Sequence, residues 1–146
     1  PRATLRLAER WPRASQRLYE LVAAGTLADE LVERWRAAEE ALYDRPDDPV
    51  VNWNADQLLA ALAEAGFVNG EIESVRLNSD LLVTSTQVDR WFGGGREGRP
   101  SYAQGLARYL SEAEILEIEQ ALRQAIAGRT VPWGRMVLFV YGQAPG

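Results

Sequence analysis

The chain has 146 residues, of which 47% are hydrophobic and 25% charged, and its formal net charge is -5. This length suits a single domain, residues 1–146, with a buried core. The sequence contains neither Cys nor His, which excludes disulfides, Ser-His and Cys-His nucleophile systems and most zinc sites. No apolar run is as long as a membrane helix and the polar start is unlike a signal peptide, so we expect a cytoplasmic protein.

Every basic residue is Arg, and the net negative charge argues against broad nucleic-acid binding by this chain alone. The N-terminus is a local exception, with five arginines: Arg2, Arg6, Arg10, Arg13 and Arg17. A solvated basic edge is the simpler interpretation of this run, and a phosphate-binding role is the alternative. Carboxylates remain as acid/base candidates. The acidic residues between Glu39 and Asp48 indicate a solvated acidic face rather than a metal site, because the calcium-loop pattern is absent.

The first elements are expected to be a strand and a helix. Leu5 and Leu7 alternate with polar residues and predict a short strand over residues 4–8. Ser15 is a candidate cap for a helix that runs to about residue 24 and that Gly25 stops.

Two longer helices are expected next. One runs to about residue 43; it is opened by Thr26 and Asp29 in a capping-box pattern, and Trp35 lies on its apolar stripe. After a loop of turn residues, a capping box predicts a second helix over residues 54–66.

The central part of the chain alternates between extended and helical patterns. Residues 70–77 are expected to form a strand, and residues 81–84 to be extended. Ser85 or Thr86 is expected to cap a short helix that ends at Phe92.

The C-terminal part predicts two helices and a strand. Residues 101–110 are expected to be helical, and Ser111 with Glu114 forms a capping box for a helix that ends at Gly128. The unbroken apolar run 136–141 predicts a strand covered on both faces, and Trp133 before it is expected in the core with Trp35. The expected fold is α/β: a three-stranded mixed sheet in the order first, last, middle, flanked by at least four helices.

Residues 93–98 match the pattern G-x-G-x-x-G. A dinucleotide fingerprint follows a strand and opens a helix, whereas this motif follows a predicted helix and is followed by Pro100. We therefore expect residues 93–100 to form a mobile loop that binds no dinucleotide. Arg96 and Arg99 are candidate contacts for an anion there. Trp91, beside this loop, is the one tryptophan placed to stack on a base, and ordinary packing is the simpler role.

Several short sequence segments occur in an order that resembles a known family. They are Arg-Leu-Tyr-Glu-Leu at 17–21, Ala-Glu-Glu-Ala-Leu-Tyr at 38–43, Asp-Asp-Pro-Val-Val-Asn-Trp at 47–53, Ala-Gly-Phe at 65–67, Arg-Trp-Phe at 90–92 and Arg-Pro-Ser-Tyr-Ala at 99–103, with Val131 and Trp133 before the last strand. In this order the chain resembles the C-terminal region of bacterial fusion proteins. Those proteins join a RarA-type (MgsA-type) recombination-factor ATPase, of the AAA+ class, to a domain similar to class I S-adenosylmethionine-dependent methyltransferases.

The resemblance implies a C-terminal fragment of a longer multidomain protein, as does the start at Pro1 rather than Met. The three strands would be the fifth, sixth and seventh of a Rossmann-like methyltransferase, with the seventh between the other two. The cofactor-binding and ATPase elements belong to the missing upstream part, so the resemblance carries over no catalytic, cofactor or metal residue, and S-adenosylmethionine or ATP would act only through upstream regions.

The function implied is a non-catalytic accessory domain of a replication-linked recombination-repair ATPase. Its partner would be the upstream domain or another replication or repair protein. The alternative is the substrate-facing half of a methyltransferase. The free edge of the first strand would otherwise pair with a missing strand, so we expect it to be covered by a helix, a second copy of the chain or the basic N-terminal segment.

Overall fold

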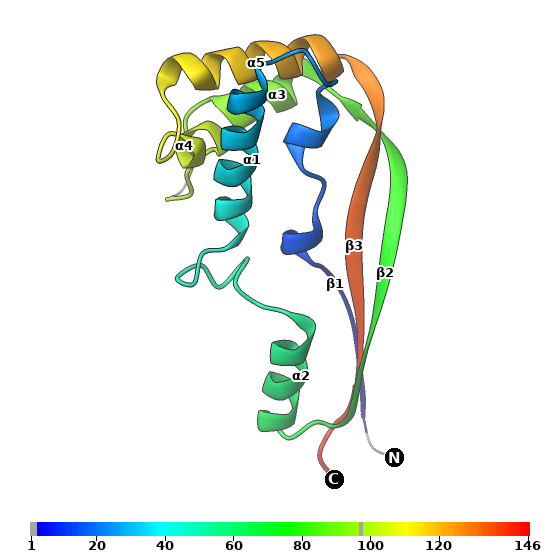
Figure 1. Cartoon of the computed structure of the whole chain (residues 1–146). Helices are drawn as coiled ribbons and strands as arrows, with labels where there is room; N and C mark the ends of the chain where they lie inside the picture. The colour runs from blue at the N-terminus through cyan, green and yellow to red at the C-terminus, as the bar shows by residue number, and fades with distance from the viewer. Residues whose placement is uncertain (1–2, 97) are drawn as a thin grey trace. The chain divides into compact units, whose positions relative to one another are not determined.

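The computed structural model of the chain describes residues 3–96 and 98–146. In chain order the elements are β1 (Thr4–Arg10), two 3-10 turns (Pro12–Ala14 and Leu18–Leu21), α1 (Asp29–Tyr43), α2 (Ala55–Glu64), β2 (Val68–Val83), α3 (Ser85–Phe92), α4 (Tyr102–Leu106), α5 (Glu112–Ile126) and β3 (Arg129–Gln143) (Figure 1).

These elements form two compact units, each assembled from segments that are distant in sequence. Unit 1 contains the chain up to Ser15 together with Asp44–Asn78 and Gly134–Gly146. Unit 2 contains Gln16–Tyr43 and Ser79–Trp133. The long strands β2 and β3 contribute residues to both units. Each unit is described below by itself.

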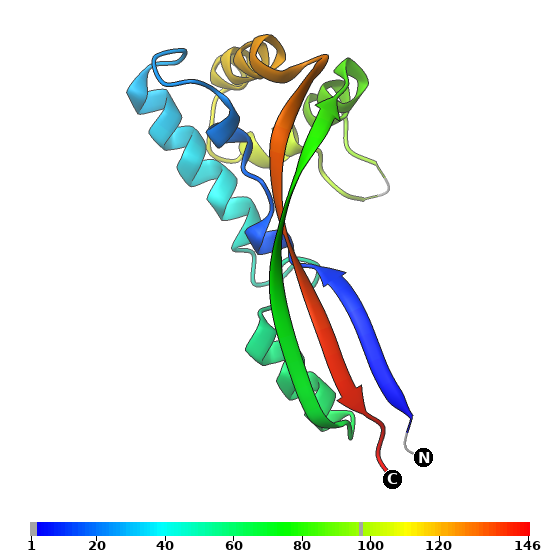
Figure 2. The same cartoon turned by 90° about the vertical axis from the view of Figure 1, so that its right-hand side faces the viewer.

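The sheet has the strand order β1-β3-β2, so the last strand is central, as the apolar run 136–141 predicts (Figure 2). β1 and β3 run antiparallel, from the pair Thr4 and Gln143 to the pair Arg10 and Val137. The expectation of a mixed sheet is wrong, because the sheet is antiparallel. β2 and β3 are also far longer than predicted. In β2, no turn interrupts the extended chain between residues 77 and 81, so the two predicted extended segments form one strand.

In unit 1 the two faces of the sheet differ. Leu138 and Val140 have no exposed surface, and Gly142 lies against the side chain of Phe67, directly after α2. Figure 1 shows α2 on one side of the sheet and no element of unit 1 on the other. Val137 and Phe139 are only partly buried, and Tyr141 is 36% exposed. In unit 1 the last strand is therefore fully buried on one face of the sheet only, and the predicted burial on both faces is not found there.

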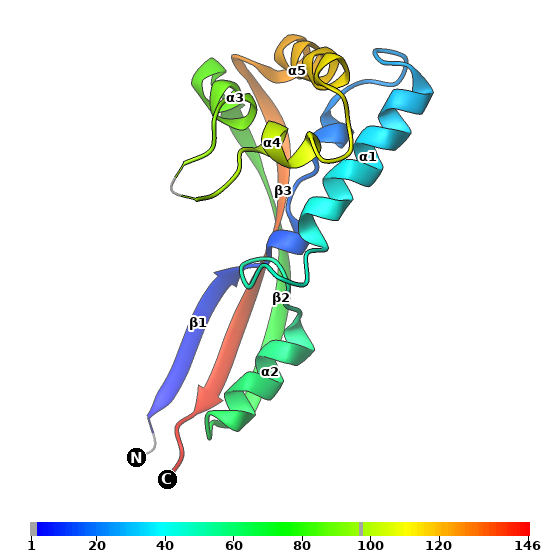
Figure 3. The same ribbon diagram turned by 90° about the vertical axis from the view of Figure 1, so that its left-hand side faces the viewer.

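In unit 2, α1, α3, α4 and α5 enclose the hydrophobic core (Figure 3). Trp35 has no exposed surface, which confirms its prediction, and its Nε1–H donates to the Tyr102 hydroxyl at 2.6 Å. The expectation that Trp133 is a core residue is wrong. Trp133 is half-buried and stacks on Trp91, with the ring centroids 6.1 Å apart. Trp133 packs against the edge of the core cluster rather than inside it.

Two of the predicted helix starts are confirmed. At α2, Asn54 accepts from the backbone N–H of Gln57 while the Gln57 side chain accepts from the backbone of Asn54. At α5, Ser111 and Glu114 make the same reciprocal pair. These boxes form where predicted because they are local interactions that need no tertiary partner.

Three predicted helix boundaries are wrong. α1 begins at Asp29, so Thr26 does not cap it; the backbone N–H of Thr26 instead closes a turn on Ala23. α3 is capped by Thr84, one residue before the predicted cap. α4 ends at Leu106, and only turns follow as far as residue 110.

The helix predicted from Ser15 to residue 24 is absent, and the segment forms 3-10 turns instead. The backbone N–H groups of Leu18 and Tyr19 donate to the side chain of Glu39 rather than to a preceding carbonyl. A tertiary hydrogen bond has therefore replaced the helical one, which a pattern along the chain does not reveal.

Candidate functional site

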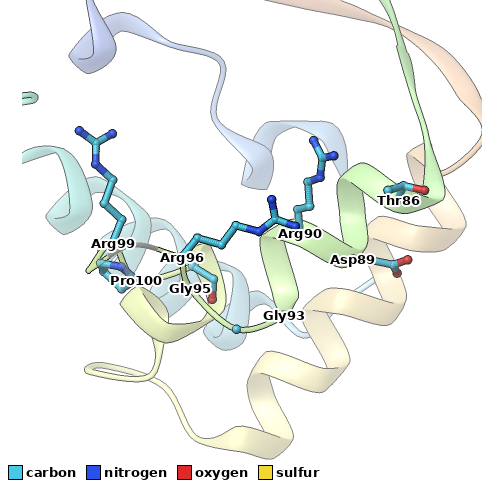
Figure 4. A pocket seen from close by; sticks show the side chains of 10 residues that line it. Thr86, Asp89, Arg90, Gly93, Gly95, Arg96, Arg99 and Pro100 are labelled. Atoms are coloured by element: carbon cyan, nitrogen blue, oxygen red, sulfur yellow. The ribbon is translucent and has the colours of Figure 1, made fainter.

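The candidate site is a hollow of about 790 Å³ in unit 2, here called the arginine hollow. It lies at the end of α3 and the loop that follows, and it is lined by Thr86, Asp89, Arg90, Gly93, Gly94, Gly95, Arg96, Arg99, Pro100 and Ser101 (Figure 4). The predicted anion contacts Arg96 and Arg99 are thus brought into one site. Sequence reasoning missed the third guanidinium group, Arg90, although it lies in the last turn of the predicted helix.

At Gly95 the loop requires glycine, because the backbone folds back on itself there. A Cβ atom at Gly95 would lie 2.2 Å from the carbonyl oxygen of Arg99. The Gln104 side chain accepts from the backbone N–H of Gly95, and the backbone of Arg96 and Arg99 forms an isolated β-bridge. A Cβ atom at Gly94 would meet no atom within 4 Å. The loop geometry therefore depends on Gly95 but leaves room at Gly94.

The same loop lacks the geometry of a dinucleotide fingerprint. It follows the helix α3 rather than a strand, as the sequence predicts, and α4 opens only at Tyr102, after the cap Ser101. One residue of the motif, Glu97, lies outside the described residues. The expected mobility of residues 93–100 stays a prediction.

Most of the described charged side chains that line the arginine hollow are positive. Figure 4 shows the side chains of Arg90, Arg96 and Arg99 rising from the same side of the ribbon. Its one described acidic side chain, Asp89, is bound to Arg123 with an Asp89 Oδ1 to Arg123 Nη2 distance of 2.6 Å. Within residues 3–96 and 98–146, none of the three lining guanidinium groups is paired with a carboxylate. The positive charge of the hollow is thus uncompensated among the described residues.

The N-terminal arginines do not form a second such site in the part of the chain that the structure describes. Arg13 pairs with Asp44 at 3.3 Å in unit 1, and Arg17 pairs with Glu40 at 2.7 Å in unit 2. Arg6 and Arg10 are exposed on β1, which fits a solvated edge. Arg2 lies outside the described residues.

A buried acidic group lies on α1, where the sequence indicates a solvated acidic face. Glu39 is only 1% exposed, and its carboxylate accepts from the backbone N–H groups of Leu18 at 2.8 Å and Tyr19 at 3.2 Å. Burial raises the pKa of Glu39 to about 7, against the opposing effect of the two backbone donors. The expectation of a solvated face is wrong for Glu39, because the segment after Ser15 folds over that part of the helix.

The neighbours of Glu39 are also bound to one another. Arg17 donates to Glu40 and its guanidinium lies 3.7 Å from the centre of the Tyr43 ring. The hydrogen bond from Arg17 lowers the pKa of Glu40. Burial, together with the bond that its hydroxyl donates to Glu40, raises the pKa of Tyr19 to about 12. These contacts tie residues 17–19 to α1, so the cluster has a structural role and its acids are engaged.

Unit 1 has a smaller hollow, of about 370 Å³, between the sheet and α2. It is lined by Glu9, Pro49, Trp53, Gln57, Leu58 and Ala61. The Trp53 indole donates to the carbonyl of Val50, and the Trp53 carbonyl accepts from the Trp11 indole. Most of the lining is apolar and holds no pair of groups suited to acid/base chemistry.

The described residues show neither a cluster of metal ligands nor a membrane-spanning helix. They contain no group of three or more Asp or Glu side chains placed to hold a metal ion. None of their helices combines the length and apolar character needed to cross a membrane.

No family model matches the chain, and no curated protein matches it. The resemblance to the RarA-type fusion proteins therefore rests on the sequence phrases alone.

Proposed function

We propose that the chain is a non-catalytic accessory domain of a replication-linked recombination-repair ATPase, and that it acts by binding. The arginine hollow is the observation that carries this proposal. It gathers three guanidinium groups without a described acid partner, and its one described carboxylate, Asp89, is bound to Arg123 rather than free to act as a base. Arginine remains protonated at all physiological pH values, so it can hold an anion but is poorly suited to proton transfer.

The acids with shifted pKa values support the same proposal. Displaced pKa values often mark catalytic groups, but ion-pair networks within a protein shift them too. Glu39 is enclosed and accepts two backbone hydrogen bonds, and Glu40 is held by Arg17. Both groups contribute to the attachment of residues 17–19 to α1, and Glu39 is buried away from any substrate.

The second candidate is the substrate-facing half of an S-adenosylmethionine-dependent methyltransferase. The strand order favours it: β3, the last strand, lies between β1 and β2 and is antiparallel to β1. This is the order that the resemblance implies for the fifth, seventh and sixth strands of that fold. The first strands and their cofactor crevice would have to come from upstream, since such folds bind ligands outside the carboxyl ends of those strands.

Calorimetric titration of the chain with S-adenosylmethionine tests the accessory role. The accessory role predicts no heat of binding, and no phosphate release when the chain is incubated with ATP and Mg²⁺. ATP hydrolysis needs a phosphate cradle, a Lys and a metal ligand, and the sequence has no Lys. Stoichiometric micromolar binding of S-adenosylmethionine would replace the accessory role with the methyltransferase one.

A further inference from the structure

We propose that the arginine hollow binds phosphate oxyanions, held by the guanidinium groups of Arg90, Arg96 and Arg99. The proposal rests on the proposed function, because it names the ligand class of the site on which that function depends. The sources of such a ligand are a free polyphosphate or nucleotide, or the phosphate backbone of a nucleic acid.

The number of cations favours phosphate over a carboxylate. One guanidinium group satisfies both oxygens of a carboxylate with its paired N–H donors. Three guanidinium groups surround one hollow, and none of them is paired with a carboxylate of the described residues, so they match a ligand with more oxygens and more than one negative charge. Thr86 and Ser101 add hydroxyl groups to the lining, and hydroxyl groups can also donate to phosphate oxygens.

The size of the hollow favours a ligand larger than one phosphate group. Its volume of about 790 Å³ lies in the range of sites that hold drug-sized ligands, roughly 300–1,000 Å³. The arginines come from the last turn of α3 and from both sides of the β-bridge in the loop. Two separate elements therefore supply cations to the hollow, which suits a ligand with more than one phosphate group.

All three arginines are exposed, which sets the character of the binding. Exposed charges are screened by salt over about 10 Å at 0.1 M ionic strength. We therefore expect modest affinity that falls steeply with salt. For a single-stranded oligonucleotide contacted through three phosphates, the slope of log K against log salt should be about -2.

The first experiment titrates the chain with inorganic tripolyphosphate and, separately, with a single-stranded thymidine oligonucleotide, at low salt. Arg90→Gln, Arg96→Gln and Arg99→Gln, combined in one variant, should weaken binding on the order of ten-fold or more. Arg108→Gln is the matched control for a single replacement, since Arg108 is exposed, belongs to the same unit and does not line the hollow. It should bind as the unaltered chain does.

A second variant blocks the hollow without removing an arginine. Gly94→Glu places a carboxylate where a side chain meets no atom within 4 Å, so the loop should keep its conformation. The variant should lose phosphate binding and show an unchanged circular dichroism spectrum and unfolding midpoint. Arg108→Gln changes the net charge by the same amount and controls for charge alone.

Binding of tripolyphosphate alone assigns the site to a free polyphosphate, and binding of the oligonucleotide alone assigns it to a nucleic-acid backbone; binding of both supports the shared chemistry. Binding of neither would overturn the proposal, as would binding that survives the triple replacement or equal competition by glutamate. None of these results depends on S-adenosylmethionine binding, so failure here is distinguishable from failure of the accessory role.

Discussion

Glu39→Gln should remove most of the pH dependence of stability between pH 5 and pH 8. Glu39 is an acid whose pKa is raised from 4.5 to about 7 on folding, because burial penalises its charged form. The folded state therefore holds the Glu39 proton more tightly than the unfolded state. The resulting stabilisation is complete below the unfolded pKa and is lost as pH rises towards the folded one.

The magnitude follows from the same two pKa values. Each pKa unit corresponds to about 1.4 kcal/mol, so the free energy of unfolding should fall by about 3 kcal/mol between pH 4.5 and pH 7 and level off above that. The window is clear because the sequence has no His and no Cys, the side chains that ordinarily titrate there. The lowered pKa of Glu40 acts only below this window, where stability is lost as pH falls.

Urea unfolding followed by tryptophan fluorescence at pH 5, 6, 7 and 8 measures the effect. The unaltered chain should lose stability across the series, and the Gln variant should give a nearly flat profile. Asp89→Asn is a control that removes a carboxylate from an exposed ion pair in the same unit, and it should keep the slope of the unaltered chain. Equal slopes for the unaltered chain and the Gln variant would refute the assignment of a raised pKa to Glu39.

Three further predictions concern the core, a helix cap and an aromatic contact. Trp35→Ala should lower the free energy of unfolding by about 3–5 kcal/mol, and Trp133→Ala should lower it by less because Trp133 is only partly buried. Urea titration of both variants measures the two losses, and equal losses would contradict the different burial of the two rings. Asn54→Ala should destabilise the chain by about 1 kcal/mol and Asn54→Asp by little, since Asp also caps helices; similar unfolding midpoints for the two would argue against the capping box. Arg17→Lys keeps the charge but loses the planar contact with Tyr43, so the unfolding midpoint should reflect a loss of about 1 kcal/mol; no change would show that the ring contact contributes nothing.

Local interactions account for what the sequence predicts correctly. The capping boxes at Asn54 and Ser111 depend on residues three apart, and both form as expected. The central position of the last strand follows from its unbroken apolar run. The helix after Ser15 fails because the N–H groups of Leu18 and Tyr19 have a partner twenty or more residues away, in Glu39. No periodicity along the chain indicates that partner.

The candidate site shows the same limit. The glycine-rich loop identifies Arg96 and Arg99 as neighbours, because they flank one turn. Arg90 belongs to a helix, and its place beside that loop depends on the path of the chain after Phe92. Likewise, the sequence shows the acidic residues of α1 but does not show that Glu39 is the one that becomes enclosed.

The central position of β3 has a consequence for the order in which the molecule is assembled. Within the described sheet, β1 and β2 each have β3 as their neighbour, and β3 is the last element of the chain. During synthesis, β1 and β2 therefore leave the ribosome with their hydrogen-bonding groups unsatisfied until residues 129–143 follow. Pairing of β1 with β3 joins segments more than a hundred residues apart, and such long-range contacts form slowly. β1 and β2 are thus exposed to mispairing until residues 129–143 have emerged.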